Sequence, residues 1–282
     1  MGFPSPIRVP AAVQGLVGAA VAAAAARSAY TLFTRALRER EGAGPSAWRR
    51  TNFRGRRVTL QEGPALAVGV CTASLFTPGL DPRVRVATAL AAAGAAGFGA
   101  YDDLVGTADA RGLRGHLGAL ARGRVTTGAV KMAGIGATGL AAAALLRRGF
   151  ADTLVDGALI AAGANLVNLF DLRPGRAVKI GLLAALPGLA SPAAPVLAPT
   201  VGACAVLLPD DLAERSMLGD SGANALGAAL GAAAVARAPR PVRLALLGGT
   251  VALTLASEVT SFSGAIDRVP LLRALDRWGR CM

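Results

Sequence analysis

Apolar stretches separated by short polar segments run along almost the whole chain. A helix needs about 20 apolar residues to cross a lipid bilayer, where its backbone polar groups must be hydrogen-bonded within the segment. The pattern therefore predicts an all-α polytopic membrane protein, with residues 1–282 forming a single integral-membrane domain. The segments next to Pro187 and Pro192 could also form one broken element. About nine helices are predicted, over residues 11–36, 63–80, 84–101, 127–146, 153–170, 178–190, 192–208, 221–236 and 243–257.

The composition agrees with a membrane protein. Apolar residues make up 53% of the chain and charged residues only 17%. The formal net charge of +13 is compatible with nucleic-acid binding, but aromatic residues are few and the basic residues are spread over loops between apolar segments. Anionic lipids and phosphorylated substrates are therefore the predicted partners, and nucleic acid is not. Cys71, Cys204 and Cys281 lie too far apart for a metal-binding motif.

Arginine and lysine are unevenly distributed between alternate loops. One set of loops carries more than twice as many as the other, and the positive-inside rule places the richer set in the cytoplasm. The N-terminus is then outside and the C-terminus inside. A cleaved signal peptide over residues 1–26 is the competing interpretation, but it would move the arginine-rich loop 37–62 outside. The predicted cytoplasmic segments are 37–62, 102–126, 171–179, 209–220 and 258–282.

The C-terminal segment 258–282 has apolar residues at helical spacing between arginines. Leu271, Leu272, Leu275 and Trp278 would fall on one side of a helix. This spacing predicts a cytoplasmic amphipathic tail that lies on the membrane surface. The alternative is an ordinary helix packed on the cytoplasmic loops.

Two adjacent carboxylates, Asp102 and Asp103, stand where the third apolar segment ends on the predicted cytoplasmic side. The partial negative charge of a helix C-terminus disfavours each by roughly 0.3–1 kcal/mol, and the two also repel each other. A divalent cation would turn this repulsion into shared ligation. The alternative is a solvated helix end that tolerates acids. Further acids are predicted on the same side, at Asp171, Asp210, Asp211 and Asp220.

The stretch ANLVNLFDLRPGR places Asn165, Asn168 and Asp171 three residues apart, on one ridge of a helix that ends on the cytoplasmic side. Such a ridge could bind a polar substrate, or its amides could link neighbouring helices. Arg173 and Arg176 follow in the next loop. They could hold phosphate, or they could simply belong to the positive cytoplasmic side.

Lys131 lies near the start of the fourth segment, and its ammonium is expected to extend towards the cytoplasmic face. There it could bind phosphate or merely reach water. The stretch MLGDSG at 217–222 precedes and opens the eighth segment. Asp220 and Ser221 could cap this helix, and Gly219 and Gly222 would let its backbone approach a diphosphate closely.

Three motifs together resemble those of the bacterial polyprenyl-phosphate N-acetylhexosamine-1-phosphate transferases, the MraY and WecA family. They are the apolar helix ending in Asp102 and Asp103, N-x-x-N-x-x-D at 165–171 and M-L-G-D-S-G at 217–222. Their order and intervals are similar to the family's over roughly residues 85–235.

The resemblance implies ten or eleven transmembrane helices around a cytoplasmic-facing cleft; with the apolar pattern, we expect about nine to ten here. It also implies Mg²⁺-dependent transfer of a sugar-1-phosphate from a UDP-sugar to polyprenyl phosphate, with release of UMP. This reaction belongs to cell-envelope glycan synthesis at the bacterial plasma membrane, with the active face in the cytoplasm.

The family's functional residues map onto this chain one by one. Asp102 and Asp103 resemble the aspartate pair assigned to metal binding and to activation of the lipid phosphate, and Asp220 resembles the carboxylate that ligates Mg²⁺. The predicted partners are polyprenyl phosphate, a UDP-sugar and the membrane, with a homodimer as a further candidate. Residues resembling the nucleotide-sugar ridge are Asn165, Asn168 and Asp171. The other predicted substrate-binding residues are Lys131, Arg173, Arg176, Ser221 and Gly222.

The chain also departs from the family. Gly106 stands where the family often has lysine, and Pro174 stands where it usually has a second acid. The family's histidine-rich motif is missing. The one histidine of the chain is His116, which we interpret as a plain loop residue. These departures predict a divergent transferase with altered sugar or nucleotide specificity. The alternatives are a catalytically inactive homologue that binds polyprenyl phosphate or a partner protein, and a transporter. Acids gathered at one face argue against transport.

Overall fold

The computed structural model describes residues 9–39, 47–106 and 112–280, and within them the chain is almost entirely helical. Each of the nine predicted apolar segments coincides with one helix, and those around Pro187 and Pro192 are two separate helices. The nine are α1 (Ala11–Glu39), α2 (Glu62–Phe76), α3 (Pro82–Val105), α5 (Thr127–Leu145), α6 (Phe150–Phe170), α7 (Arg176–Leu189), α8 (Ala194–Leu212), α9 (Gly219–Arg237) and α10 (Arg240–Ser257). The short elements are β1 (Arg49–Thr51), β2 (Arg57–Thr59), α4 (Gly112–Ala121), α11 (Phe262–Arg268) and α12 (Pro270–Arg277).

Five of the described helices are long and apolar enough to cross a membrane: α1, α3, α5, α6 and α8. A sixth span would be formed by α10 and α11 together, although they are bent by 94°. The predicted count of nine to ten spans is therefore not confirmed, and neither is a single cleft. The physical reason lies in the remaining helices. α2 and α7 have only 15 and 14 residues, while α9 is rich in alanine and glycine because protein surrounds it.

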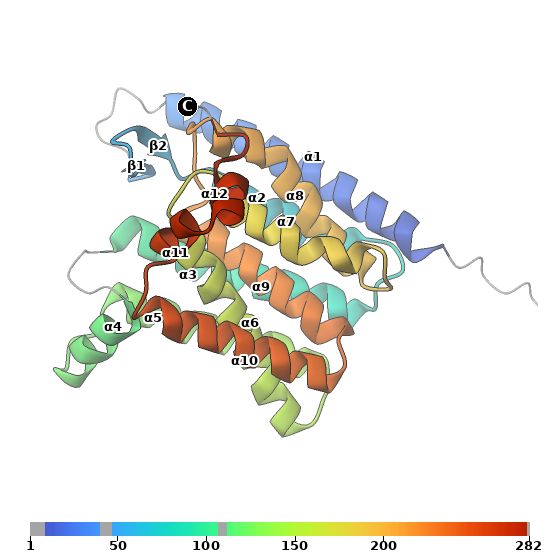
Figure 1. The fold of residues 1–282 in the computed structure, drawn as a ribbon. Helices are drawn as coiled ribbons and strands as arrows, with labels where there is room; N and C mark the ends of the chain where they lie inside the picture. Colours follow the sequence, from blue (N-terminus) through green and yellow to red (C-terminus); the bar gives the residue numbers. More distant parts are fainter. Residues whose placement is uncertain (1–8, 40–46, 107–111, 281–282) are drawn as a thin grey trace, which may run out of the picture.

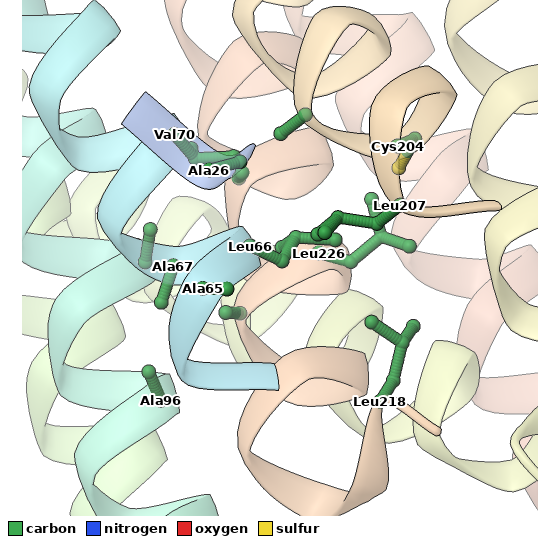
Figure 2. Close-up of a cluster of buried hydrophobic side chains, with 14 of the residues drawn as sticks. Ala26, Ala65, Leu66, Ala67, Val70, Ala96, Cys204, Leu207, Leu218 and Leu226 are labelled. Atoms are coloured by element: carbon green, nitrogen blue, oxygen red, sulfur yellow. The ribbon is translucent and has the colours of Figure 1, made fainter. Parts of the chain in front are cut away.

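α9 is the central helix. It packs against α2, α3, α5, α6, α7 and α8, and Figure 1 shows it in the middle of the molecule. Glycines bring its backbone close to its neighbours, since Gly222 lies against Gly63 of α2 and Gly227 lies against Gly163 of α6. Larger side chains fill the space between α2, α8 and α9 (Figure 2), among them Leu66, Leu207, Leu218 and Leu226.

Two glycines of α3 offer a matched test of this close packing. A Cβ on Gly99 would lie 2.3 Å from the backbone oxygen of Asp220, whereas nothing lies within 4 Å of a Cβ on Gly97. We expect Gly99→Ala to push α3 away from α9 and to lower the free energy of unfolding by about 2 kcal/mol or more. Gly97→Ala introduces a better helix former and should raise it by up to about 1 kcal/mol. Thermal unfolding in detergent measures both; equal stabilities would contradict the packing.

The described parts of the segments predicted to be cytoplasmic lie at one end of the helices, which we call the hairpin end because the antiparallel β1–β2 hairpin lies there (Figure 1). The amide of Met217 donates a hydrogen bond to the carbonyl of Thr59 at 2.9 Å, which ties the hairpin to the α8–α9 loop. In the same loop, the buried carboxylate of Glu214 accepts hydrogen bonds from Asn52 and Arg54. The hairpin is thus fixed beside the start of α9.

At the opposite end, ion pairs join α6 to α10. The buried carboxylate of Asp156 pairs with Arg243 and, at 3.4 Å, with Arg148. Asp152, one turn earlier in α6, pairs with Arg240 at 3.0 Å. These contacts hold α10 against α6 far from the hairpin end.

Candidate functional site

Three charged side chains from three helices meet at the hairpin end. Lys131, one turn into α5, places its ammonium nitrogen 2.7 Å from an oxygen of Asp102 in α3 and 2.5 Å from an oxygen of Asp220 in α9. The side chains of Lys131, Asp102 and Asp220 are 14%, 16% and 27% exposed. Because they are largely removed from water, these pairs interact more strongly than surface ion pairs do. The cluster of Asp102, Lys131 and Asp220 therefore holds two negative charges around one positive charge.

Asp103 faces the N-terminus of α9. Its two carboxylate oxygens accept hydrogen bonds from the backbone amides of Asp220 and Ser221, at 3.1 and 2.9 Å. A helix N-terminus attracts negative charge, so this contact offsets the unfavourable position of Asp103 at the end of its own helix. Gly219, with a φ of 61°, permits the approach, because a Cβ there would lie 2.9 Å from Oδ2 of Asp103. Asp103 thus binds the backbone amides at the start of α9, which were predicted to approach a diphosphate.

Ser221 and Gly222 were predicted to bind substrate, but protein surrounds both. The side chain of Ser221 is buried and its amide donates to Asp103. A Cβ on Gly222 would lie 2.5 Å from the Cα of Gly63. The glycine of this motif that lines a cavity is Gly219.

The predicted metal site needs Asp102, Asp103 and Asp220 together. Within the part of the chain that the structure describes, no group of three or more His, Cys, Asp or Glu side chains is arranged to hold a metal ion. Asp102 and Asp220 nevertheless converge on one cationic atom, the Nζ of Lys131. Mg²⁺ is usually held by one or two carboxylates, with water and substrate phosphate completing its shell. These two residues therefore suit Mg²⁺ once the ammonium moves aside, and metal binding stays a prediction.

A cavity of about 540 Å³ lies beside this cluster, and we call it the hairpin cavity because hairpin residues form part of its wall. It contains two arginines, Arg50 and Arg173, and a larger number of acids. An anionic substrate would therefore enter it together with a cation, or with some of the carboxylates protonated. The acids are Asp103, Asp171, Asp211, Glu214 and Asp220.

Asp171, the last residue of the predicted substrate ridge, lines the hairpin cavity. Burial, reinforced by the negative charges of Asp211, Asp220 and Asp103, raises the pKa of Asp171 well above its usual value. Its Oδ2 is buried and has no hydrogen-bond partner among the described residues. Protonation would lower the cost of burying this oxygen, which has no donor to pair with in the described part of the chain.

A second cavity, of about 330 Å³, is lined by Lys131 and by residues of α4, α6, α9 and α10; we call it the α5 cavity. Asn168 lines both cavities. Asn165 lines the α5 cavity and donates a hydrogen bond to Thr254 of α10 at 3.3 Å, as an amide that links helices would. His116 lies in α4, not in a plain loop, and also lines this cavity. Because Lys131 lines one cavity and its partner Asp220 the other, their contact stands at the border between them.

The two predicted phosphate-binding arginines have different surroundings. Arg173 lines the hairpin cavity; its guanidinium lies 4.6 Å from the centre of the Phe53 ring, and Nη2 is 3.7 Å from a carboxylate oxygen of Asp267. Arg176 is buried and makes two hydrogen bonds to Asp276, at 2.7 and 3.0 Å. The structure thus brings Arg173 to the site and ties Arg176 to the C-terminal segment.

Sequence reasoning missed the hairpin as part of the site. Arg50, Asn52 and Phe53 line the hairpin cavity, whereas the arginines of loop 37–62 were used only to assign topology. Glu214, which fixes the hairpin, was not singled out at all. The sequence did hold a signal in the stretch RRTNFRGRR, where the amide Asn52 and the aromatic Phe53 stand among arginines. A loop that serves only to carry positive charge needs neither residue.

Comparison with known proteins leaves the family open. A scan of the chain matches no protein-family model, and a search of curated proteins finds no matching relative. The resemblance of the three motifs therefore remains a prediction, and the function has to be argued from the geometry of the two cavities and the charged cluster between them.

Proposed function

We propose that this chain is a membrane-embedded transferase that moves a sugar-1-phosphate of the N-acetylhexosamine type from a UDP-sugar to polyprenyl phosphate and releases UMP. The observation that carries the proposal is the contact between Lys131 and Asp220 at the border of two cavities. Two substrates bound in these two cavities would meet there. We assign the UDP-sugar to the hairpin cavity, where Arg50 and Arg173 could face a diphosphate. We assign the prenyl phosphate to the α5 cavity, where Met132 and Ile135 add apolar surface.

The reaction requires positioning and charge more than covalent chemistry from the protein. An oxygen of the prenyl phosphate forms a bond to the β-phosphorus of the UDP-sugar. The anhydride bond to the α-phosphate breaks, and UMP leaves with the bonding electrons. Lys131 would neutralise negative charge where the phosphates approach each other, and Arg173 would orient the diphosphate. When bound at Asp102 and Asp220, Mg²⁺ supplies further positive charge for the leaving phosphate.

We also propose that the helices lie in a bacterial plasma membrane, with the hairpin end facing the cytoplasm. The five long apolar helices are compatible with a membrane protein. The excess of arginine in the segments at the hairpin end supports the orientation, because positively charged loops are retained in the cytoplasm. Both substrates would then reach the charged cluster from the cytoplasmic face.

A catalytically inactive homologue that binds polyprenyl phosphate is the second candidate. Two observations favour it: Asp103 is engaged by the backbone of α9, and Arg176 is engaged by Asp276. In an active family member the aspartate that Asp103 resembles would act on the lipid phosphate, and Arg176 is a predicted substrate-binding residue.

Release of UMP by the purified protein in detergent tests the proposal. With a UDP-N-acetylhexosamine, polyprenyl phosphate and Mg²⁺ present, UMP should form, and omission of the prenyl phosphate should stop its formation. That omission also controls for simple hydrolysis. Folded protein that releases no UMP with any UDP-N-acetylhexosamine, yet gains thermal stability with polyprenyl phosphate, would favour the inactive homologue.

A further inference from the structure

We propose that α12 and the following Trp278 form an anchor that lies on the anionic surface of the membrane. The inference rests on the proposed membrane placement of the helices and goes beyond the transferase reaction. The tail is not one continuous helix, since α11 ends at Arg268 and α12 starts at Pro270.

Ion pairs and hydrogen bonds, not apolar packing, hold α12 to the rest of the protein. Its one buried residue is Asp276, whose carboxylate pairs with Arg176 and with Arg280. Lys179 donates hydrogen bonds to the carbonyl oxygens of Asp276 and Trp278, at 2.9 and 2.6 Å. Arg176 and Lys179 lie in the first turn of α7. The tail is therefore fixed at the level where α7 begins, at the hairpin end.

The apolar side chains of the tail point away from these attachments. Leu271 and Trp278 are 69% and 70% exposed, and Leu272 and Leu275 are 44% and 47% exposed. A helix in water would normally bury its leucines and expose its carboxylate. The reverse arrangement in α12 indicates that another apolar medium covers the leucines.

The arginines beside the exposed leucines indicate that this apolar medium is a membrane surface. Arg268, Arg273 and Arg277 are exposed on the tail. Leucine and tryptophan flanked by arginine are typical of helices that lie in the headgroup region of a membrane, where the basic residues attract anionic lipids. A bilayer surface therefore fits both the apolar and the basic residues of the tail.

Quenching of Trp278 fluorescence by brominated lipid tests the anchor. The full chain carrying Trp48→Phe is placed in nanodiscs of phosphatidylglycerol and phosphatidylcholine brominated near the headgroup. We expect most of the Trp278 emission to be lost, and Leu271→Ser with Leu272→Ser to restore it. Asp276→Asn, which removes a tether but keeps the leucines, should leave the quenching in place.

A second tryptophan separates failure of the anchor from failure of the membrane placement. Leu90→Trp, made with both native tryptophans replaced by Phe, reports on an exposed position within α3 and should be quenched by lipid brominated deep in the acyl chains. Quenching at position 90 without quenching at Trp278 would overturn the anchor alone. Emission of Trp278 at short wavelength that no brominated lipid quenches would instead mean that a protein, including a second copy of this chain, covers the leucines, and would also overturn it.

Discussion

Lys131→Met is expected to abolish transfer and to destabilise the folded protein. The substitution keeps the length of the side chain but removes the ammonium that lies within 3 Å of both Asp102 and Asp220. Two poorly solvated carboxylates would then lack their shared partner, at a cost on the order of 3 kcal/mol. Turnover should fall by at least about 100-fold, because a group that stabilises developing charge would be lost. UMP release and thermal unfolding measure the two effects.

Two variants control the Lys131 experiment. Lys131→Arg keeps the charge and should recover most of the stability but only part of the turnover, because a planar guanidinium cannot reproduce the geometry of an ammonium. Lys179→Met removes the other lysine of the chain, which contacts only tail carbonyl groups through its described hydrogen bonds, and should leave turnover nearly unchanged. Equal losses at both lysines would show that the charged cluster has no special part in the reaction.

Asn substitutions at the three aspartates are expected to separate a role in turnover, at Asp102 and Asp220, from a role in stability, at Asp103. Asp102→Asn and Asp220→Asn should lower turnover by roughly 1,000-fold with little loss of stability, since Lys131 keeps one carboxylate partner in each. Asp103→Asn should instead be the least stable of the three. An amide has one oxygen for the two backbone N–H groups that Asp103 now accepts, and a buried unpaired donor costs about 1–3 kcal/mol.

Mg²⁺ and a matched control complete the aspartate test. The parent protein should gain thermal stability with Mg²⁺, and the Asp102→Asn and Asp220→Asn variants should not, because each lacks one of the two converging carboxylates. Asp81→Asn changes the N-cap at the opposite end of α3, where Asn caps as well as Asp, and should behave like the parent. If Mg²⁺ stabilises all variants equally, the metal binds elsewhere, and if it stabilises none of them, the parent included, it does not bind.

The positions of the helices could be predicted because a helix that crosses a membrane needs a long apolar run, and charged loops separate these runs along the chain. The number of spans could not. Alanine and glycine in α9 look apolar enough for lipid, but they serve close packing against α2, α3 and α6, as Gly222 and Gly227 show. Composition alone does not distinguish a helix that faces lipid from one that faces other helices.

For the site, the sequence predicted positions along each helix but not the contacts between residues far apart in the chain. The sequence indicated that Asp102, Lys131 and Asp220 end up on one side, because each lies near the cytoplasmic end of a predicted helix. It could not show that Asp103 caps α9, since that contact joins residues more than 100 positions apart. The pairing of Arg176 with Asp276 joins residues 100 positions apart, and only the fold reveals it.

The fate of a phosphorus label tests the central claim most directly. UDP-N-acetylhexosamine labelled at the β-phosphorus is incubated with the protein, polyprenyl phosphate and Mg²⁺, and a parallel sample carries the label at the α-phosphorus. We predict that the β-label moves into the lipid phase as a prenyl-linked diphosphate and that the α-label stays in water as UMP. In Asp220→Asn both labels should stay in water as intact UDP-sugar. A β-label that remains in water, whether as intact UDP-sugar or as free sugar-1-phosphate, would contradict the assignment of this chain as a transferase.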